Sequence, residues 1–214
     1  MSEHWPPDGY SNPKRYEVDE RYTILIAVAL TLPILAITAP KLESVVPSLL
    51  SFIQAFGQTT GIVNYPILYS ATALIVVAGW VVISGVSIVA IHEAIHYVVA
   101  LLNGTEPEFI WTERLGLKSP GIMPYGTGLT RGENIAGFIT PFILLSAFAG
   151  SIMLSSDGIV AGTAAAMFAI NSVPSCSDIY NSIKVARMPR GTKYANFDKG
   201  EGIKSEYALP KDTA

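Results

Sequence analysis

Residues 81–102 read VVISGVSIVAIHEAIHYVVALL, a segment that is almost wholly apolar around His92, Glu93 and His96. Residues four positions apart lie on one face of a helix, so the two imidazoles would lie one turn apart, where both can bind one metal ion. Glu93 would then reach a water molecule on that metal. The pattern H-E-x-x-H on a helix is typical of zinc hydrolases. Because ionisable residues in a segment of membrane length are costly, they indicate a functional site.

The composition is that of a membrane protein. Half of the 214 residues are hydrophobic and only 14% are charged, whereas soluble domains carry about 25% charged residues. The apolar residues cluster in long runs, which favours a polytopic membrane protein with a single domain. The net charge of -3 argues against a nucleic-acid partner. A single cysteine, Cys176, excludes an internal disulfide.

Four apolar segments approach or exceed the roughly 20 residues that a membrane-spanning helix needs. These segments are residues 22–39, 71–102, 135–154 and 158–173. Residues 45–63 are also apolar, but Pro47, Gly57 and several polar residues interrupt them, so we interpret them as an interfacial or re-entrant segment. The sequence therefore predicts an all-α polytopic membrane protein with about four transmembrane helices.

The loop between the second and third predicted spans has its own pattern. Residues 107–112 are strand-like, and residues 117–125 are rich in glycine and proline, which predicts a short cytoplasmic loop or hairpin. The edge of such a hairpin could pair with an extended substrate peptide. An ordinary surface loop with Trp111 at the membrane interface is the alternative.

Basic residues predict the orientation in the membrane. With four spans, thirteen of the fourteen lysines and arginines fall on the side that holds both ends of the chain and the middle loop. The positive-inside rule places that side in the cytoplasm. We therefore expect a multi-pass protein of the cell membrane with both termini cytoplasmic. A membrane-embedded domain of residues 22–186 would lie between polar tails at 1–21 and 187–214.

A catalytic zinc ion needs a third protein ligand besides the two histidines of the motif. His4 is a poor candidate because it lies in a polar, proline-rich tail. Asp178 is a better one, since it follows the fourth span on the cytoplasmic side, at a depth similar to that of the motif. Two alternatives stay open here, because aspartate often caps a helix and the thiolate of Cys176 also suits zinc. Asn171, at the end of the same span, either binds a substrate carbonyl or satisfies local backbone.

A membrane-embedded H-E-x-x-H followed by a later span that ends in Asn171, Pro174 and Asp178 resembles the site-2 protease family of intramembrane zinc metalloproteases. The chain is also similar to the small four-span proteins described as putative zincin peptidases, which are thought to be related to that family. The resemblance covers about residues 71–186. The site-2 proteases usually have Leu-Asp-Gly at the third ligand, whereas this chain has Ser-Asp-Ile.

The resemblance implies a zinc metallopeptidase. By this resemblance, His92, His96 and Asp178 would hold Zn²⁺ and Glu93 would activate a zinc-bound water. The expected partners are the lipid bilayer and a membrane protein or peptide substrate. Two other functions stay open: a non-proteolytic zinc-binding membrane protein, such as a chaperone or regulator, and a transporter-like protein with a chance motif.

Overall fold

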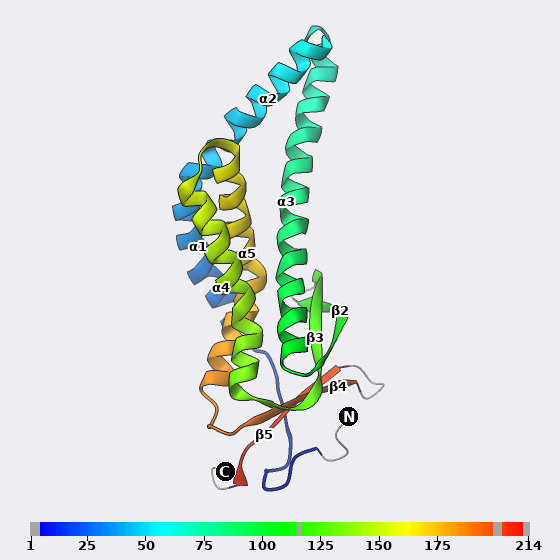
Figure 1. Cartoon of the computed structure of the whole chain (residues 1–214), viewed down its shortest axis with the longest axis vertical. Helices are drawn as coiled ribbons and strands as arrows, with labels where there is room; N and C mark the ends of the chain where they lie inside the picture. The colour runs from blue at the N-terminus through cyan, green and yellow to red at the C-terminus, as the bar shows by residue number, and fades with distance from the viewer. Residues whose placement is uncertain (1–4, 115–116, 199–202, 212–214) are drawn as a thin grey trace. The chain divides into compact units, whose positions relative to one another are not determined.

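The computed structural model describes residues 5–114, 117–198 and 203–211, and His4 lies outside these ranges. The helices of the described chain are α1 (Glu20–Glu43), α2 (Val45–Thr60), a short 3-10 turn η1 (Ile62–Asn64), α3 (Pro66–Leu102), α4 (Arg131–Ser155) and α5 (Gly158–Ala186) (Figure 1). The strands are β1 (Lys14–Arg15), β2 (Glu106–Arg114), β3 (Leu117–Thr130), β4 (Lys193–Asp198) and β5 (Ile203–Ala208).

The predicted helical membrane architecture is confirmed. Among the described residues, four helical segments are long and apolar enough to cross a membrane. These are Glu20–Thr60, Pro66–Leu102, Arg131–Ser155 and Gly158–Ala186. The segment that we interpret as interfacial or re-entrant is helix α2 followed by η1, and α2 continues almost directly from α1. Its relation to the bilayer stays a prediction.

Helix α5 is longer than the sequence suggested. The apolar segment ends at residue 173, but the helix continues through Pro174 to Ala186. Its second half carries buried polar residues at helical spacing: Asn171, Ser175, Asp178 and Ser182. Residues spaced in this way share one face of a helix. A polar stripe of α5 is therefore turned inward.

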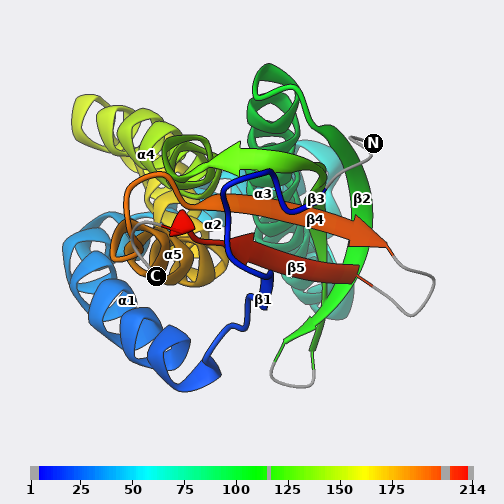
Figure 2. The same ribbon diagram turned by 90° about the horizontal axis from the view of Figure 1, so that it is seen from below.

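The strands of the described residues form an antiparallel sheet in the order β1-β5-β4-β3-β2 (Figure 2). Strands β2 and β3 form the hairpin that the sequence predicts, with Glu106 opposite Tyr125 and Arg114 opposite Leu117. Strands β1, β4 and β5 come from the segments that we interpret as polar tails. The fold is thus mostly helical, and it includes a sheet that the all-α prediction leaves out.

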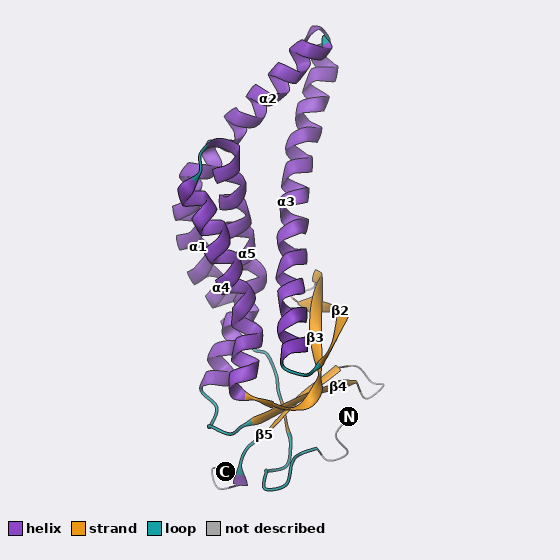
Figure 3. Cartoon of the chain, in the orientation of Figure 1, coloured by secondary structure: helices purple, strands orange, loops and turns teal. Residues whose placement is uncertain are grey.

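The chain divides into two compact units. Unit 1 comprises Met1–Ile26, His92–Pro141 and Ser175–Ala214, and unit 2 comprises Ala27–Ile91 and Phe142–Pro174. All the described strands, orange in Figure 3, belong to unit 1. Unit 2 is helical, and α5 approaches the start of α2 closely, since a Cβ atom added to Gly162 would lie 1.8 Å from a methyl carbon of Val45. Small residues allow such close approach between membrane helices.

Tyr16 joins the N-terminal segment to the rest of unit 1. Its ring contacts the rings of Tyr194 and Tyr207, and its hydroxyl donates a hydrogen bond to Asn181 Oδ1 at 3.0 Å. Burial raises the pKa of Tyr16 well above its usual range and raises the pKa of Tyr194 to about 12, because burial disfavours the charged phenolate. Tyr16 therefore remains a neutral donor, bound to α5 three residues after Asp178.

Candidate metal centre

Three side chains from α3 and α5 converge within unit 1. His92 Nε2 lies 3.0 Å from Asp178 Oδ2, His96 Nε2 lies 3.2 Å from the same oxygen, and the two nitrogens lie 3.2 Å apart. In a tetrahedral zinc site with bonds of about 2.0 Å, neighbouring ligand atoms are about 3.3 Å apart. The three atoms are therefore spaced like one face of a tetrahedral site. The structure brings together all three residues that the sequence suggests as ligands.

The charges and lone pairs of this group suit a cation. His92 is 1% exposed and Asp178 is 7% exposed. His96 Nδ1 lies 2.9 Å from the carbonyl oxygen of Gly137. If that nitrogen carries the proton and donates to the carbonyl, a neutral His96 presents the Nε2 lone pair to the Asp178 oxygen. Two acceptors at that distance repel unless a cation or proton lies between them, and two imidazoles with a carboxylate are typical zinc ligands.

The carbonyl of Gly137 is available to His96 because of a proline. Pro141 lies inside α4, four residues after Gly137, and is fully buried. A helical proline has no N–H, so the carbonyl four residues earlier loses its usual helical donor. His96 Nδ1 takes the place of that donor. Partners of this kind fix the ring orientation and tautomer of metal-binding histidines.

Glu93 lies against the same group and against strand β3. Its carboxylate interacts electrostatically with His92, His96 and Asp178, and it accepts a hydrogen bond from the backbone N–H of Ile122. The position of Glu93 is therefore set both by α3 and by the hairpin. Ile122 is a residue that sequence reasoning missed, although the hairpin that carries it was predicted.

The structure also bears on the alternatives for the region around Asp178. Asp178 lies inside the continuous helix α5, so it does not cap a helix that begins after it. Cys176 is buried, but the group that could hold a metal consists of His92, His96 and Asp178. Asn171 belongs to unit 2, is fully buried, and its Nδ2 donates to Ser146 Oγ at 3.4 Å. The proposed contact of Asn171 with a substrate stays a prediction.

A family model described as "Putative zincin peptidase" matches residues 85–193, just over half of the chain. The chain belongs to this zincin family. The matched range includes His92, Glu93, His96 and Asp178. No curated protein and no solved structure gives a significant match. The family description indicates a metallopeptidase and, as its metal, zinc.

We expect this zincin-family protein, purified in mild detergent, to hold about one zinc ion per chain. Removal of one ligand in His92→Ala, His96→Ala or Asp178→Ala should weaken zinc affinity at least about tenfold. Metal content by mass spectrometry measures this. Cys176→Ala is the matched control and should keep its zinc, because the thiol lies outside the three-ligand group. Folded wild-type protein without zinc, purified without chelators, would contradict the assignment.

Pro141→Ala tests the origin of the His96 partner. The new N–H at position 141 would offer Gly137 an ordinary helical hydrogen bond and compete with His96 Nδ1. We expect zinc affinity to fall about tenfold, as when an outer hydrogen-bond partner of a metal ligand is lost. Competition with a chromogenic chelator measures the affinity. Pro33→Ala removes another helical proline, in unit 2, and should leave zinc affinity unchanged. Equal zinc affinities in both variants would argue against the view that Pro141 frees the Gly137 carbonyl to orient His96.

Proposed function

We propose that this chain is an intramembrane zinc metallopeptidase that hydrolyses peptide bonds of membrane-associated substrates. The observation that carries the proposal is the placement of Glu93 beside the buried group of His92, His96 and Asp178. A site that only binds zinc does not need a carboxylate base next to its ligands. The group also lies on helices that are long and apolar enough to cross a membrane.

The reaction follows from these positions. His92, His96 and Asp178 would hold a zinc ion, which would acidify a water molecule and polarise the scissile carbonyl. Glu93 removes a proton from the water as its oxygen bonds to the carbonyl carbon. Glu93 then delivers that proton to the amide nitrogen as the carbon–nitrogen bond breaks. The carbonyl of Gly137 orients His96 for its part as ligand.

Hydrolysis within a membrane needs a route for water. Glu93 lies nine residues before the end of α3 at Leu102, which is about 14 Å along a helix. That depth supports a short access path from one membrane surface. We further propose, from the distribution of basic residues, that this surface is cytoplasmic and that both termini lie there. The resemblance to site-2 proteases is compatible with the same arrangement.

The hairpin offers a place for an extended substrate. Residues 117–125 of β3 pair with β2, whereas the described pairing of β3 with β4 begins at Gly126. Pro120, Ile122 and Pro124 alternate along this stretch and direct their backbone groups to the same side. Asn196 Nδ2 donates to the Pro124 carbonyl, so that side faces away from β2. Pro120 and Pro124 have no N–H, and the Ile122 N–H is bonded to Glu93, so this stretch offers only carbonyl groups to a neighbour. We propose that an extended substrate lies along this edge and donates its N–H groups to the Pro120 and Ile122 carbonyls, which places its backbone beside Glu93.

Replacing the base separates peptidase activity from zinc binding. We expect Glu93→Gln to keep its zinc and to lose at least about 100-fold in hydrolysis, because general acid–base catalysis typically contributes that much. Cleavage of a peptide library in detergent, followed by mass spectrometry, measures the activity, and zinc content is the control. Wild-type protein that holds zinc but cleaves no library or membrane peptide would favour a non-proteolytic zinc-binding protein.

The Ile122 N–H gives a second test, on the positioning of Glu93. Ile122→Pro removes this donor, and proline suits the site because Pro120 and Pro124 occupy equivalent positions two residues away. We expect kcat to fall about tenfold at unchanged zinc content, since the carboxylate loses the hydrogen bond that holds it.

The matched control for that test is Ile122→Val, which keeps the N–H and should retain kcat. If zinc content and thermal stability are equal in both variants, a difference in kcat reports the hydrogen bond. Equal kcat values would show that the Ile122 N–H does not position the base.

A further inference from the structure

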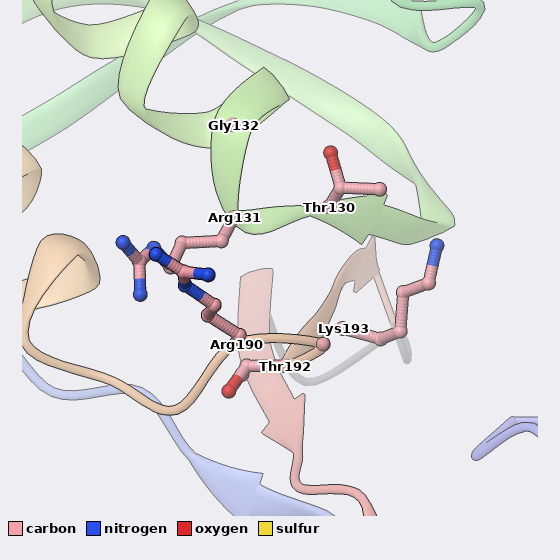
Figure 4. Close-up of a pocket in the computed structure, with 7 residues that line it drawn as sticks. Thr130, Arg131, Gly132, Arg190, Thr192 and Lys193 are labelled. Atoms are coloured by element: carbon pink, nitrogen blue, oxygen red, sulfur yellow. The ribbon is translucent and has the colours of Figure 1, made fainter.

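A pocket of about 300 Å³ lies where α4 begins and where the chain passes from α5 to β4 (Figure 4). Its lining includes three basic residues, Arg131, Arg190 and Lys193, together with small and hydroxyl residues such as Thr130 and Thr192. No aspartate or glutamate is among the residues that line it. We call this site the basic pocket. It lies entirely in unit 1, apart from the three-ligand group.

The two arginines of the basic pocket are not neutralised by a carboxylate. Arg131 donates one hydrogen bond, from Nη1 to the carbonyl of Met188 at 3.0 Å, and an arginine has five N–H donors. The guanidinium of Arg190 has no hydrogen bond or ion pair to any described residue. Figure 4 shows the two guanidinium groups on the same side of the pocket, with Lys193 extending to the other. Two like charges placed together favour a bound anion.

The remaining charges nearby are one lysine and one glutamate, which offset each other and leave the two arginines as the net charge of the pocket. Lys193 Nζ donates to the carbonyl of Gly128 at 2.9 Å and keeps its positive charge. Glu133 is the acidic residue of the first turn of α4, and its carboxylate accepts the N–H of Thr130 at 2.7 Å. Glu133 thereby caps α4, keeps its negative charge and interacts electrostatically with Lys193. The N-terminal end of a helix adds a partial positive charge to the pocket.

The position of the basic pocket identifies the source of the anion. Arg131 is the first residue of α4, Ala186 is the last residue of α5, and both helices are of membrane length. The pocket therefore lies at the ends of two spans, at the level where lipid headgroups are found. Arginine pairs phosphate through two parallel N–H donors, and basic pockets beside membrane helices bind anionic headgroups. We propose that the basic pocket binds the phosphate of an anionic phospholipid.

This binding would anchor the start of α4 and the connection from α5 to β4 at the membrane surface. The contact is independent of hydrolysis, because none of its residues belongs to the three-ligand group or lies beside Glu93 in sequence. A test therefore needs no peptidase substrate. Its failure would leave the proposed peptidase function untouched.

The experiment uses the full chain in neutral detergent with soluble short-chain lipids. Native mass spectrometry counts bound lipid and gives apparent dissociation constants for phosphatidylglycerol, phosphatidic acid and phosphatidylcholine. We expect the two anionic lipids to bind at least about five-fold more tightly than phosphatidylcholine. Arg190→Gln should abolish most of that preference. Because Arg190 is exposed and has no partner among the described residues, its loss should not affect folding.

Arg187→Gln is the matched control, since Arg187 is an exposed arginine of the same connection that does not line the pocket. It removes the same charge and should keep the lipid preference. If both variants lose the preference for anionic lipids equally, that preference reflects only general attraction between opposite charges, and the proposed site is overturned. Equal binding of all three lipids by the wild-type chain would overturn it as well.

Inorganic phosphate distinguishes the two sources of the anion. Millimolar phosphate is added to the complex with phosphatidylglycerol, and chloride at equal ionic strength is the control. If phosphate displaces no more lipid than chloride does, the result supports a lipid headgroup as the ligand. Phosphate could instead raise the thermal stability of the wild-type chain but not of Arg190→Gln, while the chain shows no lipid preference. That result would keep the phosphate site but overturn its assignment to a lipid.

Discussion

Burial of a carboxylate among apolar helices is the constraint on which the rest of unit 1 depends. Asp178 is 7% exposed and lies on a helix of membrane length. A buried charge is costly unless it is paired and hydrogen-bonded. The two imidazoles of α3 provide that pairing, and a metal ion held by the three residues would complete it. α5 is suited to carry the acid, because the neighbouring residues Ser175, Cys176 and Ser177 are buried as well.

Prolines have no backbone N–H, and this affects the hydrogen bonding around the site in two places. Pro141 frees the Gly137 carbonyl within α4, and His96 uses that acceptor. In β3, Pro120 and Pro124 remove two N–H groups from the edge that faces away from β2, so Ile122 is the donor between them, and it bonds Glu93. In α4 the helical hydrogen bond that Gly137 lacks is replaced by one to His96. In β3 the Ile122 N–H lies on an edge without a described partner strand, and it bonds Glu93 instead.

The sequence predicts those parts of the fold and of the candidate site that depend on residues close together in the chain. Helical periodicity places His92 and His96 on one face whatever surrounds them, and the order of the spans brings Asp178 to a similar depth. The length of α5 was underestimated, because its second half reads as polar and only neighbouring helices make a buried polar stripe favourable. Strands β4 and β5 were missed for a related reason. Residues 193–208 look like a charged tail. β4 and β5 pair with each other locally, but the strands that flank them, β3 and β1, and the ring contact of Tyr194 with Tyr16 come from distant segments.

Those distant segments explain why the ends of the chain belong to the same unit as the metal centre. Tyr16 packs against Tyr194 of β4 and Tyr207 of β5, and its hydroxyl holds Asn181 on α5. Through β3, the same sheet continues to the strand whose N–H meets Glu93. The sheet thus contacts α3 at the residue next to His92, and Tyr16, which packs on the sheet, contacts α5 one turn after Asp178. A mobile α3 or α5 would separate ligands that must stay about 3 Å apart. The sheet therefore holds α3 and α5 in place, so that His92, His96 and Asp178 stay together.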